Sequence, residues 1–447
     1  MNKPDSSQPG HHVLMVGGGR RDFLKATALA GGGMLASGIL GSPRPAFGVH
    51  ASGSDLLRIG LVGCGSRGTG AAADALQADP NVKLVAMADL FEDRLKSSLA
   101  ILQKDEQTAK KTAVSPERRF VGFDAYKQLM ASGVDVVLLA TPPHYRPMHI
   151  KAAIEAGLHV FAEKPVAVDA PGVRSVLATA AEAKKKHLSL VSGLCLRCSY
   201  GFRDLIHRVH NGAAGEIHTL QANDYRGAIW TKTRMLGEDD MHWQNRNWYY
   251  YTWLSGDFNV EQHVHFLDVC SWVMKNEYPV KAIGMGGRQV RNGPQFGNIF
   301  DHHSVVYEYE NGARLFANTR QQAGCEGDLS AVATGSKGRA LFSERKAGIR
   351  LDGGAEKWVY RGPENNIYHT EHDEMFAAIR KGLTINQGEY VAKSTLLAIL
   401  GRMATYTGQV ITWEQALNSK EDLSPPKYEW GPLPEPRVAM PGMTPFI

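Results

Sequence analysis

A glycine-rich turn near the start of the chain constrains its fold more than any other feature. The apolar run 59–62 predicts a buried strand, and residues 71–78 predict a helix that follows the turn directly. Between them, Gly63, Gly65 and Gly68 hold the glycine positions of a dinucleotide-binding fingerprint. They permit a tight turn, close approach of a pyrophosphate, and close packing of helix on strand. The N–H groups and dipole of the new helix then favour a phosphate.

An acid at the end of the next expected strand supports this interpretation. Residues 83–88 predict that strand, and Asp89 follows it, 21 residues after Gly68. A carboxylate there accepts hydrogen bonds from a ribose diol and repels a ribose phosphate, which favours NAD over NADP. A structural strand–helix–strand unit with an incidental aspartate is the alternative.

Strands and helices alternate beyond this unit. Residues 145–157 and 170–186 have helical patterns, and three further apolar runs are typical of buried strands: 134–140, 159–162 and 188–194. This alternation predicts an α/β fold with a doubly wound parallel sheet.

The residues that follow two of these strands could contact a cofactor or a substrate. Thr141, Pro142 and His144 form a turn at a carboxyl end, opposite the glycine turn, where a nicotinamide ribose is expected. Glu163 and Lys164 follow the next strand, and the proline after them biases Lys164 toward an extended backbone. That conformation would hold the lysine side chain at the tip of the strand.

Four motifs, taken in order and spacing, identify a family resemblance. They are Val-Gly-Cys-Gly-Ser-Arg-Gly at 62–68, Ala-Thr-Pro-Pro-His at 140–144, Ala-Gly-Leu-His-Val-Phe-Ala-Glu-Lys-Pro at 156–165, and His-x-x-Asp at 265–268. From about residue 57 to about residue 413, the chain resembles the glucose–fructose oxidoreductase, inositol dehydrogenase and rhizopine catabolism (Gfo/Idh/MocA) family. Glu-Lys-Pro is the most specific of the four motifs.

The resemblance implies an N-terminal Rossmann domain and a C-terminal α+β domain with an open, mainly antiparallel sheet. Family members mostly oxidise or reduce hydroxyls of sugars and cyclitols. The resemblance also implies that Lys164 faces the substrate hydroxyl beside the nicotinamide. The residues expected to contact NAD are Gly63, Gly65, Ser66, Arg67, Gly68, Asp89, Thr141, Pro142, His144, Glu163 and Lys164. In the second domain, alternating strands are predicted at 280–286, 303–310, 313–318, 329–334 and 339–343.

Residues 258–274 predict a helix that carries acids and a base. Glu261, His265 and Asp268 are spaced by four and three residues, so they share one face. Many relatives have aspartate at the position of Glu261 and glycine at that of His263. These departures leave the geometry of the acid–base group open.

The oxidation of a carbinol requires that the hydroxyl proton leaves together with the hydride. A neutral imidazole such as His265 accepts this proton well, because its pKa lies close to the operating pH. Lys164 would polarise or deprotonate the same oxygen, since a positively charged nicotinamide would depress its pKa. Glu261 would orient His265 or bind another hydroxyl. We predict these three residues as the catalytic group.

Four residues of the second domain are predicted to contact the substrate. Arg197 and Tyr225 lie where relatives often place such contacts, and His263 and Asp268 flank His265. Structural roles for Arg197 and Tyr225 are an equal alternative. Six aromatic residues also fall within eleven positions: Trp243, Trp248, Tyr249, Tyr250, Tyr251 and Trp253. Their flat faces suit a sugar ring, although packing is the favoured interpretation.

No metal site is predicted. Cys195 and Cys198 have Cys-x-x-Cys spacing, but they lie in an apolar run without a second pair, which favours a core role. The histidine pairs at 263/265 and 302/303 raise the alternative of a metal site. The acid–base role needs no further ligands.

Residues 1–51 resemble a twin-arginine export signal. Arg20 and Arg21 precede Phe-Leu-Lys, an apolar run at 26–40 and a small-residue site at 49–51. This route carries folded proteins, so we expect a periplasmic or otherwise exported protein. The run is too short for a stable membrane anchor. A structural N-terminal helix is the alternative.

Charge and length limit the classes of partner and the number of domains that can be expected. Of the formal charge of +5, residues 1–51 contribute +3, and the rest shows no basic stripe typical of nucleic-acid binding. After the signal we expect a Rossmann domain at 55–193, a substrate and oligomerisation domain at 194–370, and returning helices with a tail at 371–447. A homo-oligomer, dimer or tetramer, is predicted.

The leading hypothesis is an exported, NAD-dependent oxidoreductase acting on a hydroxyl of a sugar, glycoside or cyclitol. Because no free nicotinamide pool exists outside the cytoplasm, we expect tight cofactor retention, with recycling by a second sugar or another electron acceptor. One alternative is an NAD-dependent glycoside hydrolase that uses transient oxidation and elimination. A second is a sugar- or NAD-sensing protein without turnover.

Overall fold

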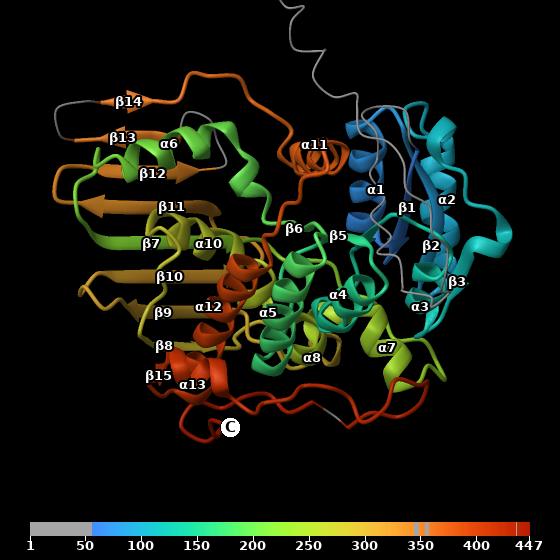
Figure 1. Cartoon of the computed structure of the whole chain (residues 1–447). Helices are drawn as coiled ribbons and strands as arrows, with labels where there is room; N and C mark the ends of the chain where they lie inside the picture. Colours follow the sequence, from blue (N-terminus) through green and yellow to red (C-terminus); the bar gives the residue numbers. More distant parts are fainter. Residues whose placement is uncertain (1–55, 344–347, 354–356, 435) are drawn as a thin grey trace, which may run out of the picture. The chain divides into compact units, whose positions relative to one another are not determined.

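The computed structural model describes residues 56–447, except 344–347, 354–356 and 435 (Figure 1). The predicted export signal at 1–51 lies outside the described residues. No helix in the described part of the chain is long and apolar enough to cross a membrane.

The first sheet has six parallel strands in the order β3-β2-β1-β4-β5-β6. Their bounds are β1 Leu57–Val62, β2 Val82–Asp89, β3 Arg119–Val121, β4 Val136–Leu139, β5 His159–Ala162 and β6 Leu190–Ser192. The order reverses between β1 and β4, and ligands of such sheets bind outside the carboxyl ends at this point. The prediction of a doubly wound parallel sheet is confirmed.

Helices from both ends of the chain flank this sheet. They are α1 Ser66–Ala78, α2 Glu92–Lys104, α3 Ala125–Met130, α4 Arg146–Glu155, α5 Ala170–Lys185, α11 Ile367–Arg380 and α12 Gly388–Thr407. Helix α11 returns to the first sheet, because Met375 and Phe376 share a core with Leu57 and Leu76. Helix α1 begins five residues before the predicted 71, since the fingerprint itself forms its first turns.

The second sheet has nine strands in the order β14-β13-β12-β11-β7-β10-β9-β8-β15, and all neighbours are antiparallel except β7 and β10. Their bounds are β7 Ile217–Arg226, β8 Lys281–Gly287, β9 His302–Glu308, β10 Arg314–Gln321, β11 Asp328–Gly335, β12 Arg339–Ser343, β13 Arg350–Asp352, β14 Trp358–Val359 and β15 Ile411–Thr412. The expected open, mainly antiparallel sheet is confirmed, although β7 was not predicted.

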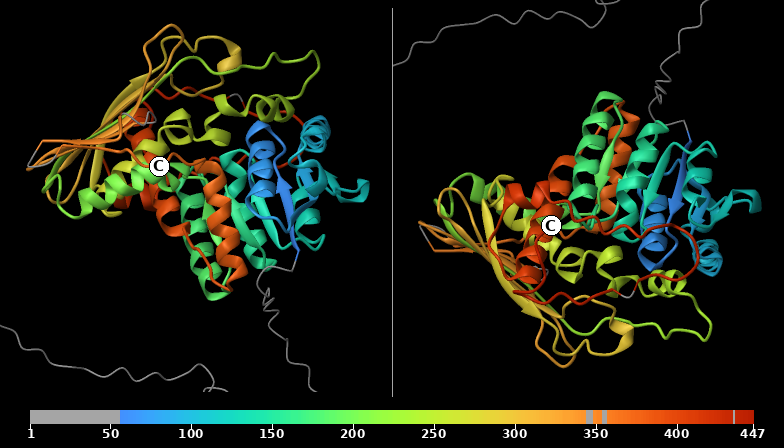
Figure 2. Two further views of the ribbon diagram at one scale, coloured as in Figure 1. Left: turned by 90° about the horizontal axis from the view of Figure 1, so that it is seen from above. Right: turned by 90° about the horizontal axis from the view of Figure 1, so that it is seen from below.

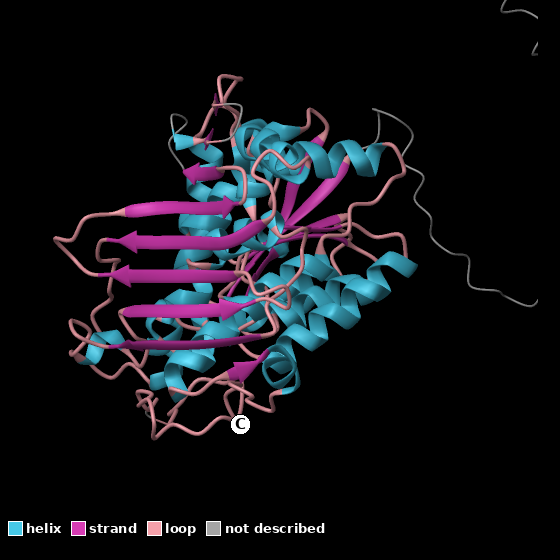
Figure 3. Ribbon diagram, turned by 90° about the vertical axis from the view of Figure 1, so that its left-hand side faces the viewer, coloured by secondary structure: helices cyan, strands magenta, loops and turns pink. Residues whose placement is uncertain are grey.

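Helices cover one face of this second sheet. Helices α6 (Tyr200–His210), α10 (Val264–Val273) and α12 pack on it (Figure 3). The opposite face carries the exposed side chains of Ile283, Met285 and Phe316. This arrangement places the amino end of α10 beside the first sheet.

The predicted helix at 258–274 is broken. The structure has α9 at Phe258–Glu261 and α10 at Val264–Val273. The main-chain carbonyl of Glu261 accepts a hydrogen bond of 2.5 Å from Lys164 Nζ, and the His265 N–H turns to Gln262 O instead. A side chain from the first domain thus takes an acceptor that a continuous helix would have used.

The C-terminal segment crosses the second domain and reaches α7 (Asp240–Arg246) (Figure 2). There the Met241 N–H donates to Gly431 O, and the Gly431 N–H donates to Asp239 Oδ1. Two short helices, α8 (Thr252–Ser255) and α13 (Trp413–Asn418), complete the described part of the second domain.

Candidate active site

A cavity of about 1150 Å³ lies along the carboxyl ends of the first sheet. Its walls come from the glycine turn, the ends of β2, β4 and β5, the loop after β7, and helices α7, α9 and α10. A volume of this size suits a dinucleotide together with part of a substrate.

The glycine turn fits a pyrophosphate. A Cβ on Gly68 would lie 1.8 Å from the carbonyl oxygen of Gly63, so only glycine allows this contact between helix and strand. Gly63 itself has a φ of +95°. At Gly65, by contrast, a Cβ would meet only the tip of Arg94 at 3.4 Å, and no side chain caps the start of α1. The N–H groups of the first turn therefore face the cavity, as an anion requires.

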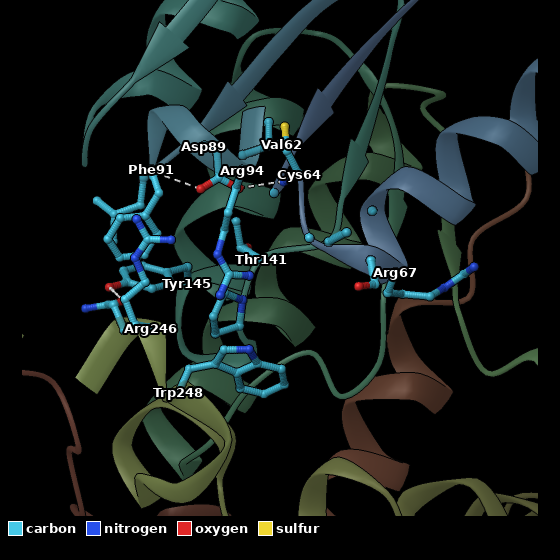
Figure 4. A pocket seen from close by; sticks show the side chains of 18 of the residues that line it. Val62, Cys64, Arg67, Asp89, Phe91, Arg94, Thr141, Tyr145, Arg246 and Trp248 are labelled. Atoms are coloured by element: carbon cyan, nitrogen blue, oxygen red, sulfur yellow. Dashed lines mark hydrogen bonds between the residues drawn. The ribbon is translucent and has the colours of Figure 1, made fainter. Parts of the chain in front are cut away.

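Asp89 is hydrogen-bonded to the backbone of this turn. Its Oδ2 accepts from the Cys64 N–H at 2.6 Å, and its Oδ1 accepts from the Phe91 N–H at 2.8 Å (Figure 4). Burial raises the pKa of this carboxyl group. Each oxygen keeps a second lone pair that can accept from a ribose hydroxyl. Arg94 extends past Asp89 into the same part of the cavity.

Lys164 and Glu261 form a buried pair between the two domains. Lys164 Nζ donates to the Glu261 carbonyl at 2.5 Å and to its Oε1 at 3.1 Å. Gln262 Nε2 donates to the other carboxylate oxygen at 2.5 Å. Glu261 therefore orients Lys164. One of its two predicted roles was to orient His265, and these contacts do not support that role.

His265 lies in the first turn of α10 and lines the cavity near Lys164. Burial, followed by the positive charges of Lys164, Arg226 and Arg67, lowers its pKa well below 6.5. Its Nδ1 has no hydrogen-bond partner among the described residues. The imidazole is therefore neutral near pH 7 and can accept a proton.

Arg67 and Glu163 join the glycine turn to the tip of β5. Arg67 Nε donates to Glu163 Oε1 at 2.5 Å, and the Lys164 N–H donates to Glu163 Oε2 at 3.3 Å. The guanidinium also lies 4.6 Å from the ring centroid of Tyr368 on α11. These contacts hold the backbone from which the Lys164 side chain extends.

A second cavity of about 510 Å³ adjoins the first. The two share Gln262, His265 and Tyr368 as lining residues. The second is further lined by Arg226, Tyr360 and Asn365, among others. Aromatic faces beside polar groups are what a carbohydrate-sized ligand needs.

Two sequence models of one family match most of the described chain. The oxidoreductase family with an NAD-binding Rossmann fold matches residues 57–190, and the GFO/IDH/MocA C-terminal domain matches residues 202–341. The chain belongs to the Gfo/Idh/MocA oxidoreductase family. Its first domain is accordingly the NAD-binding domain, as the glycine turn and Asp89 indicate.

Several curated proteins match parts of this chain at 22–29% identity. A "glycosyl hydrolase family 109 protein" of Solibacter usitatus is 29% identical over 207 residues, which cover 44% of this chain and 44% of that protein. With the similar protein of Streptomyces niveus, the match covers 40% of the relative, so the chain spans less than half the length of these two curated relatives. Inositol 2-dehydrogenase of Rhizobium meliloti is 22% identical, over 74% of this chain and 90% of that protein.

Among solved structures, the fold is similar to that of aldose-aldose oxidoreductase from Caulobacter crescentus. The TM-score is 0.63 and the identity is 18%, over 80% of this chain and 100% of that structure.

Most of the predicted cofactor contacts line the larger cavity. These are Gly63, Gly65, Ser66, Arg67, Gly68, Asp89, Thr141, Pro142, Glu163 and Lys164. His144 is the exception: it is buried, and its Nε2 forms a hydrogen bond of 2.8 Å with the Tyr428 hydroxyl. Burial lowers the pKa of His144 to about 4. His144 therefore anchors the C-terminal segment, which spacing within the first domain could not reveal.

The four predicted substrate contacts line neither of the two cavities. Arg197 donates to both oxygens of Asp268, at 2.7 and 2.8 Å, and Ser394 Oγ donates to Asp268 at 2.7 Å. His263 is fully buried beside Asn259, and its pKa falls to about 4 because of burial. Tyr225 lies over Arg320 on the neighbouring strand β10. These side chains support the fold of the second domain.

The aromatic cluster divides between the wall of the larger cavity and the core. Trp248 and Tyr249 line the larger cavity, together with Trp230. Trp243 and Tyr251 pack in a core with Leu254. The run of aromatic residues in the sequence therefore pointed to some of the residues that line this cavity. Some residues that line the cavities were not singled out from the sequence, because no motif or spacing marks them: Gln262, Tyr368 and Asn365.

The histidines of the pair at 302/303 have structural partners, and Cys195 and Cys198 are both buried. His303 contacts Asp257 and Thr405 at 3.2 and 2.9 Å, and His302 contacts Asp301 at 2.8 Å. Burial raises the thiol pKa values of Cys195 and Cys198. In the part of the chain that the structure describes, no group of histidine, cysteine and acidic side chains is arranged to hold a metal ion.

Proposed function

We propose that this protein oxidises or reduces a hydroxyl-bearing carbon of a sugar, glycoside or cyclitol with NAD. One observation carries the proposal: Lys164 and His265 line the same cavity as the glycine turn and Asp89. The nucleotide site and the proposed acid–base pair thus share one cavity.

The chain's own residues handle the proton. Lys164 has three N–H donors, of which two have acceptors on Glu261. The third is available to a substrate hydroxyl oxygen and polarises it. The neutral imidazole of His265 accepts the hydroxyl proton as the carbonyl forms, and it returns the proton in the reverse direction. Bound NAD supplies the hydride acceptor.

The comparisons support the substrate class. Matches include "inositol 2-dehydrogenase" and "aldose-aldose oxidoreductase", which act on ring-shaped polyols and aldoses by their names. The second cavity leaves space for the part of a substrate that lies beyond the reacting carbon.

The test is an activity screen over glucosides, amino sugars and inositols, followed by the absorbance of reduced nicotinamide. Wild type should reduce bound nicotinamide with at least one of these classes, whereas a Lys164→Met variant loaded with the same nucleotide should not. A Lys164→Met variant as active as wild type would refute the proposed acid–base group, whereas a wild type inactive with every one of these classes would favour a sensing role.

We also propose that the protein is exported by a twin-arginine signal and works as a homo-oligomer with a resident nucleotide. Export in a folded state would carry the nucleotide along. Turnover then needs a second, carbonyl-bearing carbohydrate or another electron acceptor to accept the electrons. Cell fractionation of wild type and an Arg20→Lys, Arg21→Lys variant tests export, and the mass of the purified protein in solution tests assembly.

Glycoside cleavage is a second candidate, because four proteins named as glycosyl hydrolase family 109 are among the matches. Transient oxidation of a ring carbon would acidify the neighbouring C–H and allow elimination of the aglycone. Water would then add, and the carbonyl would be reduced again. Relatives of this kind carry a Gly-x-Gly-x-x-His-like segment where this chain has Glu-Gln-His-Val-His at 261–265, which favours the oxidoreductase. Release of a chromogenic aglycone without net NADH would support cleavage.

A further inference from the structure

A part of the second domain lies across the end of the cavity nearest Asp89. Arg246 of α7 donates to both oxygens of Asp93 on α2, at 2.7 and 2.6 Å. Its guanidinium also lies 3.9 Å from the ring centroid of Phe91 (Figure 4). Since Asp89 marks the ribose position of the nucleotide, this contact bridges the two domains beside the adenosine half.

The C-terminal segment adds a second layer at the same place. The ring of Trp430 lies 5.8 Å from Phe91, 4.9 Å from Phe123 and 5.3 Å from His242. The backbone around Trp430 is held on α7, because the N–H groups of Gly431 and Leu433 donate to Asp239 and Asp240, both at 3.1 Å.

The contacts that join these segments are made by residues that also form the cavity wall. Phe91, Asp93, Phe123, His242 and Arg246 all line the cavity. Three segments far apart in sequence therefore meet at one end of the nucleotide site. None of these contacts involves Lys164, Glu261 or His265, so the closure is separate from the acid–base group.

We propose that α7 and the C-terminal segment form a lock that retains the nucleotide over many catalytic cycles. The Asp93 side chain is 63% exposed, so the ion pair alone contributes little. The aromatic contacts of Trp430 and the position of Arg246 over Phe91 add to it. All three must separate before the adenosine end opens, which slows release of the nucleotide. The purpose of retention, turnover by exchange between carbohydrates, rests on the proposed function. The retention of the nucleotide does not depend on it.

The test measures release without any carbohydrate. The full chain is loaded with NADH and mixed with excess NAD, and the decay of nicotinamide fluorescence gives the dissociation rate constant. We expect Trp430→Ala and Arg246→Gln each to accelerate release by about tenfold relative to wild type. Trp430→Phe should restore slow release, because it keeps an aromatic ring. Lys281→Gln is the matched control, since it removes the ion pair with Glu308 on β8 and β9 and should leave release unchanged.

Two outcomes would overturn the lock. One is wild-type release as fast as that of the variants. The other is acceleration by Lys281→Gln equal to that by Arg246→Gln, which would indicate a general loss of stability. Thermal unfolding of each variant shows whether it is folded. A wild type that retains NADH yet oxidises no carbohydrate would leave the lock intact and count against the proposed function.

Discussion

Lys164 donates a hydrogen bond to the main-chain carbonyl of Glu261, and the helix that carries His265 begins again only after this point. One contact between the domains thus places the ammonium group and sets the start of α10. The break in the helix and the acid–base group have the same origin.

Replacement of Lys164 by methionine removes the ammonium group and keeps much of the buried volume. We expect kcat to fall by about 10²–10⁴-fold, the usual contribution of a positioned proton donor or acceptor. NADH binding, followed by fluorescence, should change little, because the glycine turn and Asp89 are untouched. Loss of binding together with activity would instead assign Lys164 a role in holding the nucleotide.

Gly68→Ala should weaken nucleotide binding and stability together. The new Cβ would lie 1.8 Å from Gly63 O, and relief of such overpacking costs about 1–3 kcal/mol. It would also displace the turn that faces the pyrophosphate. Gly70→Ala in the same helix is the matched control, since its Cβ would meet only Arg67 Nη1 at 3.5 Å. Titration with NADH and thermal unfolding of both variants check this; equal effects at the two positions would contradict it.

The pH profile of oxidation should reflect the lowered pKa of His265. The base must be unprotonated, and because burial and nearby cations lower its pKa, it stays unprotonated below pH 6.5. We therefore expect kcat/KM for oxidation to remain level from pH 8 down through 6.5 and to decline only at lower pH. His265→Asn should remove this acid limb and lower the plateau. A midpoint at or above 6.5 in wild type would show that His265 is not the base.

Asp268→Asn tests whether Asp268 is structural. Removal of one partner of a buried ion pair leaves Arg197 uncompensated and costs about 3–5 kcal/mol of the free energy of unfolding. Asp204→Asn, in a half-buried pair with Arg208 on the helix surface, should cost less than about 1 kcal/mol. Urea unfolding measures both. The KM for carbohydrate should be unchanged in folded Asp268→Asn protein, and a large rise in KM would restore Asp268 as a substrate contact.

The local sequence pattern predicted the first domain well. Buried parallel strands are continuous apolar runs, and the spacing of the glycines reflects the tight turn and the close contact of helix and strand that the backbone needs there. Strand β7 was missed because His218, Thr219, Gln221 and Asn223 interrupt its apolar positions, although it lies in the middle of the second sheet. Spacing placed Glu261, His265 and Asp268 on one helical face. It could not show that Lys164, 97 residues from Glu261, would interrupt that helix.

The separation of Asp268 from the site has a similar cause. Its partner Arg197 comes from a short turn at Cys195–Cys198, and only the packed structure brings the two together. Likewise, Tyr428 reaches His144 from 284 residues away. Such pairings depend on tertiary packing, which short-range periodicity does not encode.

The pairing of Lys164 with Glu261 has a consequence for how a substrate arrives. One partner extends from the first sheet and the other from the second domain, so a hinge motion that parted the domains would pull the ammonium group off its carboxylate. A ligand that uses Lys164 in this position must therefore bind while the domains remain together, and the smaller cavity, lined by Tyr360 and Asn365, adjoins the one that contains this pair.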